Sequence, residues 1–456
     1  MAERSHTADQ SIDVADDARP RAASRWPDAW LRALVLRKLA GLRGGCVTLT
    51  EGGSTITIGH AAPGGLAGRV EAHAPAFYRH LALGGSLGAA ESYIRGEWSS
   101  PDLTTLLRVF ARDLAAGDRL EGTSVAAAAV ERVAHWLRRN TRRGSASNIH
   151  AHYDLGNEFF GLMLDDTMAY SCGIFESPAS SMQDASVAKF DRVCRKLALA
   201  PGDHVLEIGT GWGGFAVHAA GRYGCRVTTT TISAEQHRFA AARIANAGLT
   251  DRVTVLTQDY RDLTGSYDKL VSIEMIEAVG HDFLDTFFQV CCDRLRPDGL
   301  AVLQAITMPD FRYDRYRRSV DFINKCIFPG GCLPSLGAMR AAMGRATDFR
   351  LVHLEDLTPH YVTTLQRWRD QMVRHEARIR SLGFDDRFLR TWHYYLSYCE
   401  AGFAERYVGN VQITLARPAC RVATALPSDT EPRVPHDVVS HPTAVSGKVP
   451  ATALSR

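Results

Sequence analysis

The sequence predicts an α/β protein, with a doubly wound, mainly parallel sheet and a smaller N-terminal α+β accessory domain. One observation is the alternation of short β-branched runs with helical stretches between residues 205 and 306. Another is the pair of strand-like runs before residue 60, flanked by helical patterns. The composition agrees, because 456 residues with 45% hydrophobic and 23% charged side chains exclude a fully disordered, collagenous or coiled-coil chain.

The accessory domain is expected at residues 28–140, after a polar tail at 1–27 that has the composition of a disordered segment. A second disordered tail is expected at 419–456. The elements expected in the accessory domain are an amphipathic helix, two strands and a further helical stretch, over residues 30–39, 46–50, 54–58 and around 78–117.

The larger domain is expected at residues 141–418. Its strands are expected at 205–209, 226–232, 252–257, 268–273 and 299–306. Its helices are expected near 213–222, 233–247 and 282–295. The second of these helices has clear end signals, because Ser233 precedes Gln236 at the capping-box spacing and Gly248 follows the last turn.

Cysteine usage and hydropathy predict a cytoplasmic protein. The ten cysteines contain no CxxC pair, and no secretory signal opens the chain, so free thiols in a reducing compartment are expected. No apolar run approaches the ~18 residues of a spanning helix. Any membrane contact should therefore be peripheral, and the net charge of +3 argues against a dedicated nucleic-acid binder.

Two local clusters lie between residues 132 and 152, and each has a simple structural explanation beside a functional one. The arginines of Arg132–Arg143 surround Trp136, and either a phospholipid head-group role or a solvated face explains them. His150 and His152 could be a pair of metal ligands, but no further Cys, His or Asp residues complete a ligand set, so no metal site is predicted.

The strongest single motif is the glycine loop VLEIGTGWGG at Val205–Gly214, which follows a predicted strand and opens a predicted helix. Glycines let the backbone approach a ligand closely, and ligands of open α/β sheets bind at the carboxyl ends of the strands. Glu207 lies within the strand, whereas Thr230–Ser233 offers no acid at the position where NAD enzymes carry one. The pattern indicates an S-adenosylmethionine site, and a tight turn without a ligand is the alternative.

Several further blocks occur in a characteristic order, and with them the chain resembles the cyclopropane-fatty-acyl-phospholipid synthase family, which includes mycolic-acid cyclopropane synthases. The resemblance covers about residues 80–418 and rests on these blocks: His152–Phe160, Tyr170–Cys172, the glycine loop, Thr231–Gln236, Gln258–Asp262, Ser272–Gly280 and Ile327–Ser335. It implies a class I methyltransferase (Rossmann-like) sheet. It also implies transfer of a methylene carbon from S-adenosyl-L-methionine to a cis double bond, through a carbocation that a bound bicarbonate deprotonates.

The resemblance assigns the cofactor contacts residue by residue. Tyr170 and Ser171 should meet the methionine end, Gln236 the ribose, and Tyr260 and Arg261 the adenine. Completing the expected cofactor set are Glu207, Gly209, Gly211, Gly213 and Thr231.

The resemblance also implies a bicarbonate site formed by Cys172, Glu277, Ile306 and Tyr361, with Cys172 and Ile306 acting through their backbone. Gln304 stands where many relatives carry His; its amide can donate a hydrogen bond but cannot become charged. Cys399 is a further catalytic candidate, although alkene methylation needs no thiol nucleophile. Glu274 lies close to Glu277 in the sequence and is expected to be structural.

The expected partner is the surface of a phospholipid bilayer, at the inner membrane face, and the resemblance leaves a homodimer open. The expected product is a cyclopropane fatty acid. A poorly held base would instead allow a methylene or methyl branch. More distant alternatives are a small-molecule N- or O-methyltransferase and a catalytically silent lipid-binding protein.

Overall fold

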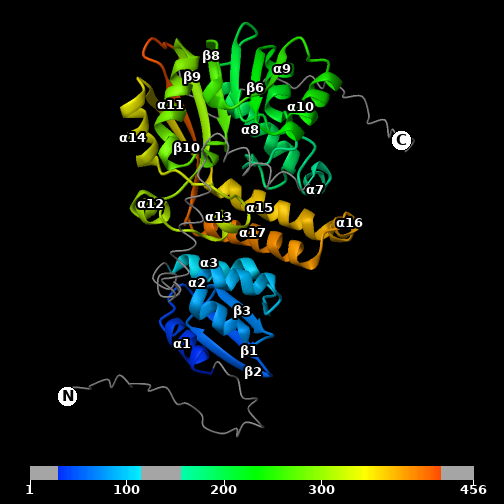
Figure 1. The fold of residues 1–456 in the computed structure, drawn as a ribbon, viewed down its shortest axis with the longest axis vertical. Coiled ribbons are helices and arrows are strands. Elements are labelled where there is room, and N and C mark those ends of the chain that lie inside the picture. Colours follow the sequence, from blue (N-terminus) through cyan, green and yellow to red (C-terminus); the bar gives the residue numbers. More distant parts are fainter. Residues whose placement is uncertain (1–28, 114–155, 423–456) are drawn as a thin grey trace, which may run out of the picture. The chain divides into compact units, whose positions relative to one another are not determined.

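A computed structural model describes residues 29–113 and 156–422, which form two β-sheets with their flanking helices (Figure 1). Outside the described residues lie the Arg132–Arg143 cluster, His150, His152, all of the expected tail 1–27 and most of the expected tail 419–456. The expected domain boundary at 140/141 also lies there.

The N-terminal sheet has four strands in the order β2-β1-β3-β4. Its strands are β1 (Cys46–Glu51), β2 (Ser54–Gly59), β3 (Ala67–Ala72) and β4 (Trp98–Ser99). β1 and β2 form an antiparallel hairpin because Gly52 and Gly53 both adopt positive φ, which a tight two-residue turn requires. Its helices are α1 (Ala29–Leu39), α2 (Ala76–Ile94) and α3 (Leu103–Arg112).

The helical pattern around 78–117 was expected to be one stretch, and this expectation is wrong. Gly96 at φ 77° turns the chain after α2, and Trp98–Ser99 then pairs with β3 as a short strand. Asp102 caps the next helix by accepting a hydrogen bond from the Thr105 amide at 2.9 Å. Short-range helical periodicity did not reveal this strand because a two-residue strand has no period.

The larger sheet has seven strands in the order β10-β11-β9-β8-β5-β6-β7. Its strands are β5 (His204–Ile208), β6 (Arg226–Thr231), β7 (Val253–Thr257), β8 (Tyr267–Ile273), β9 (Leu295–Thr307), β10 (Arg350–Asp356) and β11 (Gly409–Ala416). Strands β5 to β9 run parallel, as expected, and β11 and β10 add an antiparallel edge. The strand order reverses at β5, and such a switch point is where open α/β sheets bind ligands.

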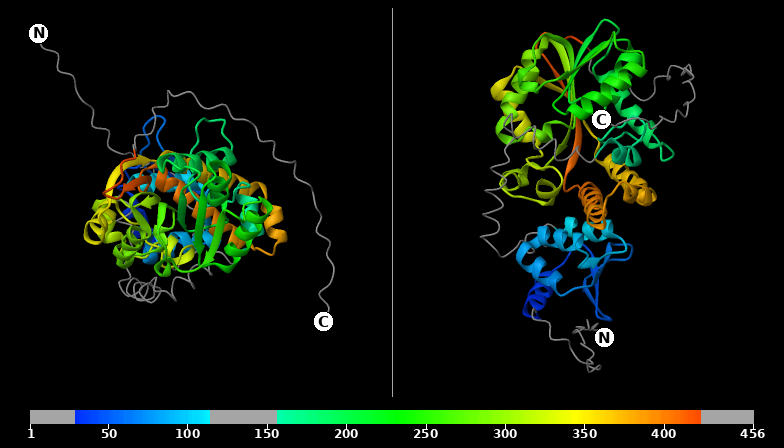
Figure 2. Two further views of the ribbon diagram at one scale, coloured as in Figure 1. Left: turned by 90° about the horizontal axis from the view of Figure 1, so that it is seen from above. Right: turned by 45° about the vertical axis from the view of Figure 1, so that its right-hand side comes forward.

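Helices cover both faces of this sheet, as the views in Figures 1 and 2 show. The helices α9 (Gly214–Tyr223) and α10 (Ala234–Asn246) pack against β6 and β7, whereas α11 (Leu284–Arg294) packs against β9 and α14 (Leu336–Ala346). The remaining helices are α7 (Asn157–Met163), α8 (Met182–Lys196), α12 (Asp310–Tyr316), α13 (Phe322–Cys326), α15 (Thr358–Arg374), α16 (Glu376–Ser381) and α17 (Asp386–Ala404). Short 3-10 turns are η1 (Tyr260–Asp262), η2 (Ile276–Ala278) and η3 (His281–Phe283).

Helix α17 connects the N-terminal module (residues 29–113) with the module that contains the seven-stranded sheet (residues 156–422). It lies beside α15 and also contacts α3 and α2 (Figure 1). Arg390 of α17 donates to the carbonyl oxygens of Tyr93 at 2.6 Å and Trp98 at 2.8 Å, and its guanidinium lies 4.1 Å from the Tyr93 ring centroid. Within 29–113 and 156–422, none of the helices has the length and apolar character needed to cross a bilayer.

Candidate active site

The glycine loop follows β5 and leads into α9, as the sequence predicts. Gly209, Gly211 and Gly213 have φ angles of 104°, 52° and 83°, in the region that L side chains rarely adopt. A Cβ on Gly209 would lie 3.2 Å from the Met275 side chain, whereas one on Gly211 would meet no atom within 4 Å. Gly211 therefore presents bare backbone to open space, which suits close approach by a ligand.

Glu207 lies beneath this loop with its carboxyl buried. Its Oε2 has no hydrogen-bond partner within the described part of the chain. Burial raises the pKa of Glu207 to about 8. A buried acceptor without a partner costs free energy, so this oxygen fits a ligand that brings a donor, such as an ammonium or hydroxyl group of the cofactor.

The other predicted cofactor residues gather around the same loop. Thr231 donates to Gln236 Oε1 at 2.8 Å, and both residues line the cavity. Ser171 accepts a hydrogen bond from the fully buried Lys189 at 2.6 Å, and burial lowers the pKa of that lysine. Arg261 does not line the cavity, and its guanidinium instead pairs with Asp259 at 2.6 Å.

Some of the groups expected at the bicarbonate site, the Cys172 amide, Gln304 and Tyr361, converge on Glu274, directly after β8. Its Oε1 accepts hydrogen bonds from the Cys172 amide at 3.0 Å, Gln304 Nε2 at 2.8 Å and Asn410 Nδ2 at 2.8 Å. Its Oε2 accepts from the Tyr361 hydroxyl at 2.7 Å. The residue expected to be structural thus stands at the centre of the site, and these donors are already committed to a carboxylate of the protein.

Glu277 lies beside this carboxylate in a different environment. Its Oε1 accepts from the Ile306 amide at 2.6 Å, and its buried Oε2 has no partner among the described residues. Burial, and then the charge of Glu274, raise the pKa of Glu277 well above its usual range, which favours its neutral form.

A line of amides fixes the orientation of Gln304. Lys196 can only donate, and it does so to Gln412 Oε1 at 2.8 Å. Gln412 then donates to Gln304 Oε1 at 2.9 Å, so the Gln304 amide nitrogen must face Glu274. The described residues therefore do not fit a bound bicarbonate, since Glu274 already occupies the donors of Cys172, Gln304 and Tyr361.

The two candidate thiols lie in apolar surroundings. Burial raises the pKa of both Cys172 and Cys399, so both remain in the protonated form, which is not nucleophilic. Cys172 contributes its backbone amide to Glu274, whereas Cys399 lines the cavity as a small apolar side chain.

One cavity of about 1710 Å³ joins these features. Most of the predicted site residues line it: Tyr170, Ser171, Glu207, Gly209, Gly211, Thr231, Gln236, Tyr260, Glu277, Ile306, Tyr361 and Cys399. The cavity lining does not include Cys172, Gln304, Gly213 or Arg261. The cavity passes Tyr395 and Phe403 and reaches Leu81, Leu106 and Phe110 of the N-terminal module. Because pockets for drug-sized ligands measure ~300–1,000 Å³, this volume has room for a long apolar chain in addition to a cofactor.

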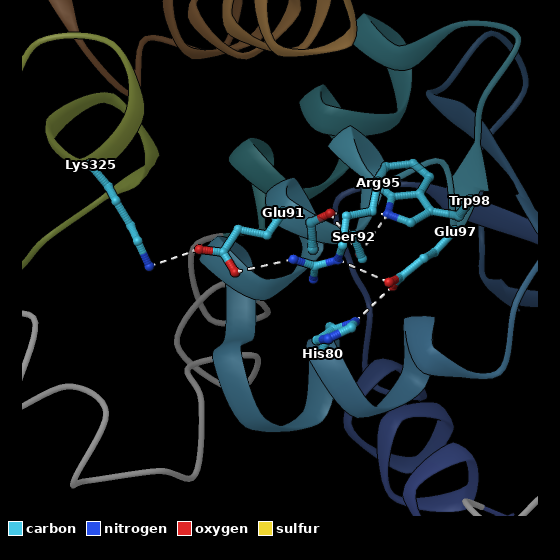
Figure 3. Close-up of polar contacts among 8 residues, drawn as sticks. His80, Glu91, Ser92, Arg95, Glu97, Trp98 and Lys325 are labelled. Atoms are coloured by element: carbon cyan, nitrogen blue, oxygen red, sulfur yellow. Dashed lines mark hydrogen bonds and ion pairs between the residues drawn. The ribbon is translucent and has the colours of Figure 1, made fainter. Parts of the chain in front are cut away.

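A chain of polar contacts borders the cavity where α2 meets α13 (Figure 3). Lys325 pairs with Glu91 at 2.7 Å, and Arg95 lies between Glu91 at 3.8 Å and Glu97 at 2.9 Å. His80 completes the chain at 2.7 Å from Glu97. The Lys325–Glu91 pair joins a helix of each module, and nothing in the local sequence pattern of α2 indicated these contacts.

The sequence analysis also missed Asn410 and Gln412, which reach the site from β11. Asn410, Gln412 and Thr414 are buried polar residues at alternate positions of an otherwise apolar strand. This period of two was the available signal, because it places three polar side chains on one face of the strand.

Comparison with known proteins shows the family of the chain. The family model described as mycolic acid cyclopropane synthetase matches residues 140–413. The tuberculostearic acid methyltransferase UfaA1 of Mycobacterium tuberculosis is 41% identical over 76% of this chain and 82% of its own. The cyclopropane-fatty-acyl-phospholipid synthase of Escherichia coli is 34% identical over 75% of this chain and 86% of its own.

Solved structures show the same fold. The mycolic acid cyclopropane synthase CmaA1, complexed with SAH and CTAB, is 31% identical, with a TM-score of 0.56 over 59% of this chain and 98% of that one. Coclaurine N-methyltransferase, at 19% identity and a TM-score of 0.51, shares the fold alone. The chain belongs to the mycolic acid cyclopropane synthetase family and is an S-adenosylmethionine-dependent lipid methyltransferase.

Proposed function

We propose that the chain transfers a one-carbon unit from S-adenosylmethionine to the cis double bond of an unsaturated acyl chain in membrane phospholipid, and that the product is a cyclopropane fatty acid. The observation that carries this proposal is the continuous cavity from the glycine loop, past Glu274 and Tyr361, to the apolar interior of the N-terminal module. Such a cavity brings an alkene in the middle of a long chain to the cofactor. It is unsuited to a small polar acceptor.

The relatives support the same class of substrate. The Escherichia coli relative is named a cyclopropane-fatty-acyl-phospholipid synthase. The tuberculostearic acid methyltransferase relative favours a methyl-branched product as the second candidate. A methyl branch would require a reductant in addition to S-adenosylmethionine, whereas ring closure requires only a base.

The residues fit the cofactor that the family implies. Glu207 has an unpartnered acceptor, Gly211 exposes its backbone, and Ser171 and Gln236 face the same cavity. When bound, S-adenosylmethionine supplies an electrophilic methyl group. The protein's own side chains orient the alkene, exclude water from the carbocation and accept the proton, while the ring of Tyr361 stacks on Phe403 at 4.4 Å between centroids.

The mouth of the cavity is the proposed site of contact with the bilayer, at the inner face of the membrane. Phe311 on α12 is 79% exposed and also lines the cavity. Arg315 and Arg318 lie beside it on the same lining. An exposed aromatic ring flanked by guanidinium groups suits an interface of acyl chains and phosphate groups. The Arg132–Arg143 cluster stays a separate, untested candidate outside the described residues.

The experiment is incubation with vesicles of oleoyl-containing phosphatidylglycerol and S-adenosylmethionine, followed by mass analysis of the released fatty acids. A gain of one CH₂ is expected, and proton NMR should show ring protons and no exocyclic methylene. A gain corresponding to a methyl group plus hydrogen, dependent on added reductant, would favour the branched product. Phe311→Ser should weaken vesicle binding and leave cofactor affinity unchanged, with the exposed Leu351→Ser on β10 as the matched control.

A further inference from the structure

We infer that the carboxylate of Glu274, rather than a bound bicarbonate, is the base that removes the proton from the carbocation. This inference rests on the proposed function. The observation behind it is the set of donors to one side chain: a backbone amide, two side-chain amides and a phenol all point at the Glu274 carboxylate. A bicarbonate ion would need the same donors, and the protein has supplied the anion itself.

The backbone at Glu274 places this carboxylate in the site. Glu274 has φ 49°, and few other non-glycine residues of the described chain have positive φ. Such a conformation is uncommon for a residue with a Cβ, and residues that adopt it cluster at functional sites. Glu274 lines the same cavity as the glycine loop, Tyr361 and Phe403, and the proposed reaction brings the new methyl group into this cavity.

The reaction balances with Glu274 as the only base. The alkene π electrons form a bond to the methyl carbon as its bond to sulfur breaks, which releases S-adenosylhomocysteine and leaves a cation on the second alkene carbon. The Glu274 carboxylate then takes one proton from the new methyl group, and the electrons of that C–H bond close the ring. Glu274 ends as a neutral acid, and its proton returns to solvent before the next turnover.

The neighbouring carboxyl is a poorer choice for the base. The Glu277 carboxyl accepts a hydrogen bond from the Ile306 amide, and its second oxygen is buried without a partner in the described ranges. Burial and the charge of Glu274 raise its pKa, which favours its neutral form. The environments of the two carboxyls thus differ, because within the described chain four donors face Glu274 and one faces Glu277.

The test compares Glu274→Gly with Glu274→Gln. Glycine tolerates the positive φ at this position, so the first variant keeps the backbone and leaves the donors of Cys172, Asn410 and Tyr361 free for an added anion. Glutamine keeps the volume and removes the charge. Binding of ¹³C-bicarbonate is followed by NMR in carbon-dioxide-free buffer, and turnover on oleoyl phospholipid is measured with and without added bicarbonate.

Wild-type protein should show no saturable bicarbonate binding and no dependence of turnover on bicarbonate. Glu274→Gly should bind bicarbonate and should lose turnover by ~10²–10⁴-fold without it, which is the usual contribution of a general base, and regain activity when it is added. Glu274→Gln should lose a similar factor with no recovery. Cofactor affinity, measured by calorimetry, should be unchanged in both variants.

Saturable bicarbonate binding by the wild type, a wild-type rate that rises with bicarbonate, or full turnover in Glu274→Gln would overturn the inference. Failure of the proposed function is distinguishable from these results. If the wild type adds no carbon to any lipid, the proposed function fails, while the NMR comparison of wild type with Glu274→Gly still decides whether Glu274 or bicarbonate occupies the anion site.

Discussion

Arg390 is the residue on which attachment of the N-terminal module to the methyltransferase domain can be tested most directly. Arg390→Met keeps the aliphatic stem and removes two charge-assisted hydrogen bonds, to the carbonyls of Tyr93 and Trp98. Each such bond contributes ~1.5–3 kcal/mol, and the stacking on Tyr93 adds ~0.5–1 kcal/mol. Arg390 is only half-buried, and the Tyr93 carbonyl oxygen keeps its hydrogen bond from the Gly96 amide. We therefore expect the free energy that holds the N-terminal module in place to fall by an amount near the lower end of these contributions, about 3 kcal/mol.

A loss of about 3 kcal/mol corresponds to about a hundredfold greater population of the locally opened state. Hydrogen exchange followed by mass spectrometry should show that much less protection at the end of α2 and in β4. Lipid turnover should fall because the module supplies part of the cavity wall, whereas cofactor affinity should be unchanged. Arg387→Met, at an exposed position of the same helix, is the control. Unchanged exchange in α2 and β4 would refute this account of the contact.

Three further outcomes are expected. Gly211→Val should abolish S-adenosylmethionine binding in calorimetry and keep the fold by circular dichroism, because the valine side chain would fill open cavity space. The control Gly202→Val, which is also in open space but away from the cavity, should bind the cofactor normally. Burial raises the pKa of Glu207 to about 8 in the folded state, against 4.5 ordinarily. The free energy of unfolding should therefore fall by at most about 5 kcal/mol as the pH rises between these two values. Glu207→Gln should remove this pH-dependent part, as measured by urea unfolding at pH 5 and pH 8.5. Gln304→His should slow turnover most below about pH 6.5, where the imidazole is protonated. The imidazolium would pair with Glu274 and would place its second N–H against the N–H of the Gln412 amide. Faster turnover than the wild type across the pH profile would contradict this prediction.

The local pattern of the sequence was enough to predict the five parallel strands of the larger sheet and the cofactor loop, but not the antiparallel strands β10 and β11. β-branched runs and capping residues such as Ser233 act over a few positions, and the structure confirms their strands and helices. The glycine loop is equally local, because positive φ at Gly209, Gly211 and Gly213 is required by the turn itself. Family resemblance then supplied the cofactor and the class of reaction.

The identity of the group at the centre of the site was decided by tertiary structure. Glu274 looked like a structural neighbour of Glu277, because three residues of separation give no information on which carboxylate meets the distant donors of Cys172, Asn410 and Tyr361. Those donors come from three other parts of the chain, and only folding brings them to within 3.0 Å of one side chain. The same holds for Gln304, whose orientation depends on Lys196 and therefore on a hydrogen-bond chain that crosses from β9 through β11 to α8. A sequence encodes which groups can donate and accept, but the free energy of a buried charge depends on all of its neighbours at once, and these are assembled only in the folded protein.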